Sequence, residues 1–168
     1  MGYCVEYYAK YLLYGENFLG DKIVYAMMNC HLKSYEEEKN LVIIRACLLK
    51  YKDDMRLNFG EEVYQKIKVP TVNTLRKPEA QDFVNAVIEL GTKTADFVRE
   101  HMNVEESKNT SPFFCTEHIV GIADFVSKDT IIDLKCTNHI DLQMVRQVLG
   151  YHQCRWSYKN KDEVYDVV

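Results

Sequence analysis

Apolar residues in the first part of the chain recur at the three- and four-residue spacing of helices. The stretch Glu36–Tyr51 is the clearest case, because acidic residues occupy its first turn while Lys50 and Lys52 close it, as the helix dipole favours. The polar run 69–78 contains two prolines and follows the last helical pattern. We therefore predict an all-helical N-terminal part over residues 1–75 and a second part over residues 76–168.

The pattern of the second part changes from helix to strand and back. Its first stretch carries an apolar stripe at helical spacing, and Gly91 on that stripe predicts a close approach to a sheet. Further on, β-branched and aromatic residues flank the polar turn Ser127–Asp129, which predicts a hairpin. In order, we predict a helix (78–102), a loop (103–112), strands (113–126 and 130–136), a helix (141–156) and a last strand (163–168). This is an α/β (α+β) fold of helix, mixed β-sheet, helix and strand.

Length and charge restrict the class of protein. The 168 residues fit one compact domain, or one domain with an appendage. The net charge is −4, which argues against a bulk electrostatic grip on nucleic acid, but not against an enzyme that uses metal ions and a local groove. No apolar run approaches the roughly 20 residues of a membrane span, and no basic region precedes an apolar block at the start. We expect a soluble, cytoplasmic protein with no membrane partner.

Tyrosine and cysteine are both frequent. Tyr3, Tyr7, Tyr11 and Tyr14 share one helix face, which predicts a half-buried stripe; a platform for stacking nucleobases is the alternative. The six cysteines contain no C-x-x-C pair and no zinc spacing, so we expect reduced thiols.

Three charged residues interrupt the predicted hairpin. Asp133 and Lys135 lie two positions apart and therefore project from the same face of a strand. The turn at 127–129 brings Asp124 close to that face. Charges on a mostly buried sheet are unfavourable unless they are paired or bound to metal. A plain ion pair between Asp133 and Lys135, with Asp124 as a turn residue, is the alternative.

Two carboxylates are hard oxygen donors that suit Mg²⁺ or Mn²⁺. Such a metal polarises a phosphate and lowers the pKa of bound water. Lys135 beside it is placed to orient that water or to neutralise developing charge. The reaction that fits these groups best is phosphodiester hydrolysis.

The same stretch resembles a known family. Gly-Ile-Ala-Asp at 121–124 and Ile-Ile-Asp-Leu-Lys-Cys-Thr at 131–137 precede a helix that carries Gln-Val-Leu-Gly-Tyr at 147–151. These runs resemble the motifs of the PD-(D/E)XK nuclease superfamily, in its RecB-like exonuclease branch. The resemblance covers residues 79–168, and the predicted order of helix, strands, helix and strand agrees with the core of that family.

The resemblance implies roles for five residues. Asp124 and Asp133 would bind the metal, and Lys135 would assist the attacking water. Gln147 and Tyr151 would complete the catalytic set by lining the cleft and contacting the substrate. Their spacing of four residues independently places Gln147 and Tyr151 on one helix face.

The chain departs from this family in its third metal ligand. Many members carry a histidine or glutamate on the first core helix, often as G-x-x-x-H, but here Ala95 stands four residues after Gly91. Glu117 and His118 are the candidate substitutes, and each can equally be a surface residue. Some members hold an iron–sulfur cluster through three late cysteines; only Cys154 lies late here, so no cluster is expected.

We therefore predict a Mg²⁺- or Mn²⁺-dependent deoxyribonuclease, more in keeping with an exonuclease than an endonuclease, that acts on single- or double-stranded DNA ends. A non-catalytic nucleic-acid-binding or interaction module of the same fold is one alternative, favoured by the missing helix ligand and the acidic balance. An RNA endonuclease with the same catalytic residues is another. Membership of a larger complex stays open.

Overall fold

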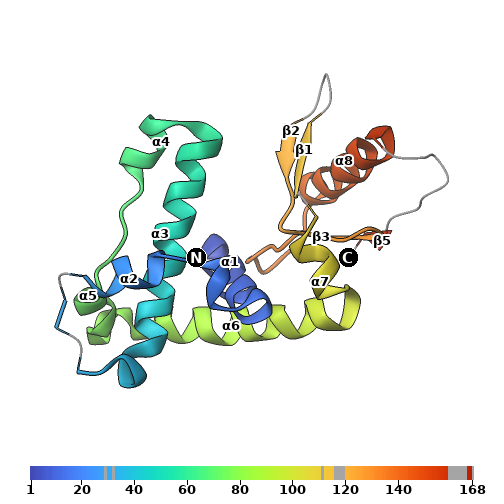
Figure 1. Ribbon diagram of the computed structural model, residues 1–168. Coiled ribbons are helices and arrows are strands. Elements are labelled where there is room, and N and C mark those ends of the chain that lie inside the picture. Colours follow the sequence, from blue (N-terminus) through green and yellow to red (C-terminus); the bar gives the residue numbers. More distant parts are fainter. Residues whose placement is uncertain (29, 32, 111, 116–119, 159–165, 168) are drawn as a thin grey trace. The chain divides into compact units, whose positions relative to one another are not determined.

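The computed structural model describes residues 1–28, 30–31, 33–110, 112–115, 120–158 and 166–167 (Figure 1). Contacts group the chain into two compact units, residues 1–95 and 96–168. Our division of the sequence fell after residue 75, whereas the chain passes from one unit to the other within a long helix, α6 (Gln81–His101).

The predicted α/β fold is wrong, because the described chain is mostly helical, about 70%. Its strands are two or three residues long and belong to separate two- and three-stranded sheets. The predicted strand 130–136 ends at Ile132, and two residues later Leu134 N donates to the side chain of Asp124 at 2.5 Å. A side chain thus takes the place of a backbone acceptor, and the ladder stops there. Sequence periodicity does not reveal this competition.

Every described element before α6 is helical, as predicted for residues 1–75. The helix α3 begins at a serine cap, where Ser34 Oγ accepts a hydrogen bond from Glu37 N at 3.1 Å. It ends at Gly60, whose φ of 92° favours glycine. These elements are α1 (Gly2–Tyr14), η1 (Glu16–Phe18), α2 (Lys22–Met27), α3 (Tyr35–Phe59), α4 (Glu61–Lys66), α5 (Val72–Arg76) and η2 (Pro78–Ala80).

The glutamate run at the start of α3 contains a residue, Glu38, that stabilises the fold. Glu38 is buried and accepts two hydrogen bonds from the Arg76 guanidinium, which joins α3 to α5. These bonds hold the pKa of Glu38 below its ordinary value. The helix α5 itself lies in the predicted connector; Thr71 Oγ1 caps it by accepting from Thr74 N, and Leu75 is buried.

The tyrosine stripe of α1 packs against α3. The ring of Tyr3 stacks on that of Tyr51, with centroids 4.0 Å apart and planes 7° from parallel. Tyr7 donates a hydrogen bond from its hydroxyl to Asp54 at 2.6 Å. These two residues thus have a structural role in packing, as predicted, but Tyr7 is buried and Tyr3 is 41% exposed, so neither is half-buried. Buried aliphatic residues of both helices complete this core, among them Val5, Val42, Ile43 and Ile44.

Gly91 allows a close approach, but to a helix and not to the predicted sheet. A Cβ atom at Gly91 would lie 2.6 Å from Cδ1 of Tyr8 on α1, and Tyr8 is buried. The sequence marks the need for a small residue on this stripe. It does not tell which element packs there.

Gly91→Ala is expected to destabilise the protein by about 1–3 kcal/mol, because relieving the overlap requires the buried Tyr8 ring to move. This outweighs the gain in helix propensity of about 1 kcal/mol. Urea unfolding measures the difference. Thr92→Ala, at the next and exposed position of α6, is the control and should be close to neutral. A stabilising Gly91→Ala would show that α1 and α6 are not in close contact at this position.

The second unit combines short strands with α8. Strands β1 and β2 pair antiparallel, β3 and β4 pair antiparallel, and β5 pairs parallel with β4. Ala123, Val126 and Ile131 form a buried core with Tyr151 of α8. The elements are α7 (Val104–Lys108), β1 (Phe113–Cys115), β2 (Val120–Ile122), β3 (Phe125–Val126), β4 (Thr130–Ile132), α8 (Leu142–Tyr158) and β5 (Asp166–Val167).

The predicted hairpin is confirmed, while the predicted loop 103–112 contains a helix. In the hairpin, Phe125 faces Ile132, and Ser127 N donates to Thr130 O at 2.9 Å. The helix α7 begins at Asn103, whose Oδ1 accepts from Glu106 N at 3.0 Å. None of the helices within the described ranges combines the length and apolar character that crossing a membrane demands.

Candidate active site

The β3–β4 hairpin brings the predicted charged residues together. Asp124 comes directly before β3 and Asp133 directly after β4, so both lie at the open end of the hairpin. Asp124 Oδ2 accepts from Leu134 N, which fixes the aspartate beside the chain segment that follows β4. The strand that we predicted through Cys136 ends at Ile132, yet the side chains still converge.

Asp133 and Lys135 form an ion pair, with Lys135 Nζ 2.6 Å from Asp133 Oδ2. The Asp133 side chain is only 4% exposed, and its Oδ2 accepts no hydrogen bond of normal geometry. Burial raises the pKa of Asp133, and the negative charge of Asp124 raises it further, while Lys135 acts in the opposite direction. The carboxylates are therefore close enough to repel one another, and a cation between them would relieve that repulsion.

Lys135 is held as a cation. Burial alone would lower its pKa, but the contact with Asp133 and the charge of Asp124 raise it above the ordinary lysine value. An ammonium group in this state donates hydrogen bonds and does not accept protons at neutral pH. It suits the stabilisation of negative charge on a phosphate.

A chain of hydrogen bonds joins Lys135 to α8 and then to β2. Lys135 Nζ donates to Gln147 Oε1 at 2.9 Å, and Gln147 Nε2 donates to the Tyr151 hydroxyl at 2.6 Å. That hydroxyl donates to Ile122 O at 3.0 Å. The predicted placement of Gln147 and Tyr151 on one helix face is thus confirmed, while their contact with a substrate stays a prediction. Gln147 directly positions Lys135.

Gly121 lets the Tyr151 ring approach β2. A Cβ atom at Gly121 would lie 2.5 Å from Cε1 of Tyr151, which is buried. Any larger residue would push the ring away from Ile122 O and disturb the link to Gln147. This close approach is a structural reason for glycine at position 121 of the sequence motif.

Gly121→Ala is expected to destabilise the fold by about 1–3 kcal/mol through this overlap. Gly150→Ala, on α8 next to Tyr151, is the matched control, because a Cβ atom there meets nothing within 4 Å. It should stabilise the protein by about 0.5–1 kcal/mol through backbone entropy. Thermal unfolding of the two variants measures the opposite signs; equal shifts would contradict the close approach of Tyr151.

The side chains present fit a hard divalent cation in part. Asp124 and Asp133 supply carboxylate oxygens, and the buried Oδ2 of Asp133 has the Lys135 ammonium 2.6 Å away. Across the described ranges, no group of three metal-ligating side chains occurs. The two candidate third ligands, Glu117 and His118, lie outside the described residues. Waters and substrate phosphate oxygens commonly fill the other positions around Mg²⁺.

A groove of about 420 Å³ opens beside the ion pair, and we call it the α8 groove. Asp133, Lys135 and Thr137 are its polar lining residues. Sequence reasoning missed its apolar wall, although the i, i+4 recurrence of apolar residues along the helix was the signal to follow. The apolar residues of the groove are Ile140, Met144, Val145, Val148 and Leu149.

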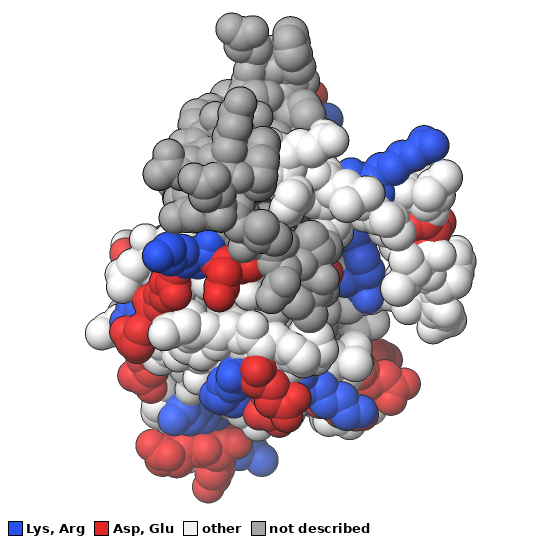
Figure 2. Space-filling view, turned by 90° about the vertical axis from the view of Figure 1, so that its right-hand side faces the viewer, with Lys and Arg blue, Asp and Glu red and all other residues white. Residues whose placement is uncertain are grey.

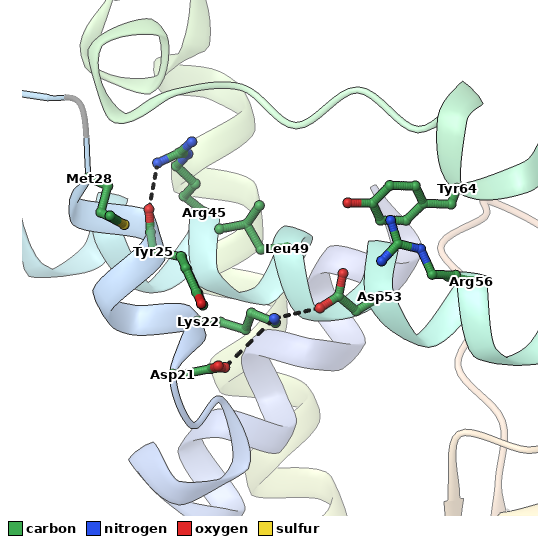
Figure 3. Close-up of a pocket in the computed structure, with 9 residues that line it drawn as sticks. All are labelled: Asp21, Lys22, Tyr25, Met28, Arg45, Leu49, Asp53, Arg56 and Tyr64. Atoms are coloured by element: carbon green, nitrogen blue, oxygen red, sulfur yellow. Dashed lines mark hydrogen bonds and ion pairs between the residues drawn. The ribbon is translucent and has the colours of Figure 1, made fainter. Parts of the chain in front are cut away.

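A second pocket, of about 430 Å³, lies in the first unit against α3 (Figure 3). Figure 3 shows Lys22 held by Asp53, and Arg45 turned toward the Tyr25 carbonyl, to which it donates at 3.1 Å. These contacts tie α2 to α3, although the Nε atom of Arg45 is buried without a hydrogen-bond partner. Because its charges already hold helices together, this pocket is a weaker candidate than the carboxylate site.

Comparison with family models, with curated proteins and with solved structures finds no match for this chain. A functional assignment therefore rests on the chemistry of the side chains in the site. Similar constellations of reacting groups occur on unrelated folds, so the site has to be tested directly.

Proposed function

We propose that this chain is a Mg²⁺- or Mn²⁺-dependent nuclease that hydrolyses DNA phosphodiester bonds, acting as an exonuclease. The single observation that carries the proposal is the convergence of two carboxylates and a lysine ammonium at one end of the β3–β4 hairpin. The motif resemblance to RecB-like exonucleases adds to it, although the proposal does not depend on that fold.

Each residue has a distinct task in the proposed reaction. Asp124 and Asp133 would hold the cation, which when bound polarises the phosphate and makes water a better nucleophile. Lys135 donates hydrogen bonds to a phosphate oxygen as negative charge develops there. Gln147 holds the ammonium in place, and Tyr151 holds Gln147. Water oxygen bonds to phosphorus and loses a proton, while the bond to the leaving sugar oxygen breaks and that oxygen gains a proton.

The surface charge favours local binding over a broad electrostatic grip. On the face shown in Figure 2, acidic and basic side chains lie beside one another, and neither positive nor negative charge dominates the surface of the described residues. Affinity for DNA would then come from the cation, Lys135 and contacts in the groove, so it should depend only weakly on salt.

The proposal includes a cytoplasmic location. Cys4 and Cys47 are buried free thiols, which suits a reducing compartment. Burial raises the pKa of Cys4 to about 12 and that of Cys47 as well, so neither thiol is reactive. Action within a larger complex is compatible with this proposal.

The test is digestion of end-labelled linear and circular DNA, single- and double-stranded, with Mn²⁺, Mg²⁺ or EDTA. Metal-dependent cutting that spares circles is expected for an exonuclease. Cutting of circles would make it an endonuclease, and preferential cutting of RNA would change the substrate. Absence of cutting by folded protein with every metal would contradict the proposal and favour a non-catalytic module.

A further inference from the structure

The α8 groove exposes large apolar side chains directly beside the ion pair. Ile140 is 78% exposed, Leu149 51% and Val145 45%. Each exposed aliphatic side chain forgoes the free energy that burial would provide, and contiguous exposed apolar surface commonly marks a binding site. Asp133 and Lys135 line the same groove, so whatever lies in it touches the proposed reacting groups.

The groove is charged at one end and apolar along its wall. Lys135 supplies a cation at the charged end, where a phosphate would lie in the proposed reaction. Among the described lining residues of the wall, Thr137 alone has a polar side chain. The matching ligand is anionic at one end and flat and apolar beyond it. A nucleotide has this shape, with its phosphate joined through a sugar to a base.

The apolar wall favours an unpaired base. In a duplex, the faces of each base are covered by its stacked neighbours, so a base must leave the stack before a protein groove can contact its face. Aliphatic side chains give favourable contact to any base, but they offer no hydrogen-bond pattern that distinguishes one base from another. A volume of about 420 Å³ is within the range of small-molecule pockets, roughly 300–1,000 Å³.

We infer that the α8 groove holds the base and sugar of one unpaired nucleotide, next to the phosphate at Lys135, without reading the identity of the base. The substrate is therefore single-stranded DNA of any sequence. This inference rests on the proposed function, since the polar end of the groove is the proposed reaction site.

Binding without cutting tests the groove on its own. Anisotropy of a fluorescein-labelled dT12 strand in EDTA should show about tenfold weaker binding for Leu149→Asn and Val145→Asn. Leu142→Asn is the matched control: Leu142 is exposed on the same helix but does not line the groove, and its substitution should leave binding unchanged. Affinity for a blunt 12-base-pair duplex should be the same in all three variants.

Equal binding by wild type and both groove variants would overturn the inference. So would an equal loss of duplex and single-strand affinity. Sedimentation of the same variants tests a second copy as the occupant: a wild-type dimer that Leu149→Asn converts to a monomer, with DNA binding unchanged, would assign the groove to self-association instead.

A cleavage experiment separates this inference from the proposed function. The wild-type protein should cut a strand that carries one abasic residue about tenfold more slowly at one of the two phosphates beside that residue. Leu149→Asn should not show this dependence. Cutting at the same rate with and without the abasic residue would overturn the inference but leave the proposed nuclease function unaffected. Groove-dependent binding without any cutting would support the groove and contradict the nuclease.

Discussion

Lys135→Met is expected to lower metal-dependent DNA cleavage by a factor of about 10²–10⁴. Methionine keeps an unbranched apolar stem, one atom shorter than lysine, but removes the ammonium that contacts Asp133 and Gln147. A charge that contacts the bound phosphate and interacts more strongly with it as negative charge develops affects the rate more than substrate binding. Steady-state kinetics should therefore show a large fall in kcat and a smaller rise in KM.

The same variant reports on the cation site. Without Lys135, the buried Asp133 carboxylate has lost its ion-pair partner, so the melting temperature in EDTA should fall. Mn²⁺ should restore much of this loss, because it supplies the missing positive charge. Lys128→Met, in the exposed turn of the same hairpin, is the control and should change neither activity nor melting. A Lys135→Met enzyme with full activity would remove the ammonium from the mechanism.

The sequence predicted local contacts better than the fold, and the ion pair of Asp133 with Lys135 is the one that the alternative to a metal site predicted. Asp133 and Lys135 were placed together by strand alternation, and their side chains do meet, although the strand ends at Ile132. The polar turn made the hairpin predictable, and helical spacing paired Gln147 with Tyr151. Short-range rules sufficed for these three contacts because each joins residues close in the sequence or linked by one turn. The hydrogen bond from the Tyr151 hydroxyl to Ile122 O, which joins residues 29 positions apart, was not predicted.

The errors came from local hydrogen bonds and from choices of packing partner. Side-chain caps at Thr71 and Asn103 begin short helices in segments whose polar composition indicated loops. The Asp124 side chain ends a strand that composition predicted to continue. Gly91 packs against Tyr8, far away in the sequence, and no local pattern identifies such a partner. Sheet length and helix partners therefore depend on tertiary structure.

Asp133→Asn is expected to reduce metal-dependent cleavage about a thousandfold, because a neutral amide is a much poorer ligand for Mg²⁺ than a carboxylate. In the absence of metal, by contrast, the substitution should leave the stability of the fold unchanged or increase it. Burial and the charge of Asp124 raise the pKa of Asp133 above its ordinary value of 3.8. The folded protein thus binds that proton more tightly than the unfolded chain. The stability that follows is present at acidic pH and is lost as pH rises through the folded pKa.

At neutral pH in EDTA, the wild type therefore contains an unfavourable buried charge that Asp133→Asn lacks. The variant should melt at the wild-type temperature or above it, and its melting should depend less on pH between the ordinary and the raised pKa. Mn²⁺ should raise the melting temperature of wild type but not of the variant. Asp129→Asn, in the exposed turn, keeps the acceptor for Ser127 and Thr130 and should behave as wild type. If Asp133→Asn kept both cutting and stabilisation by Mn²⁺, Asp133 would be an ion-pair partner only, and the cation would have to be held elsewhere.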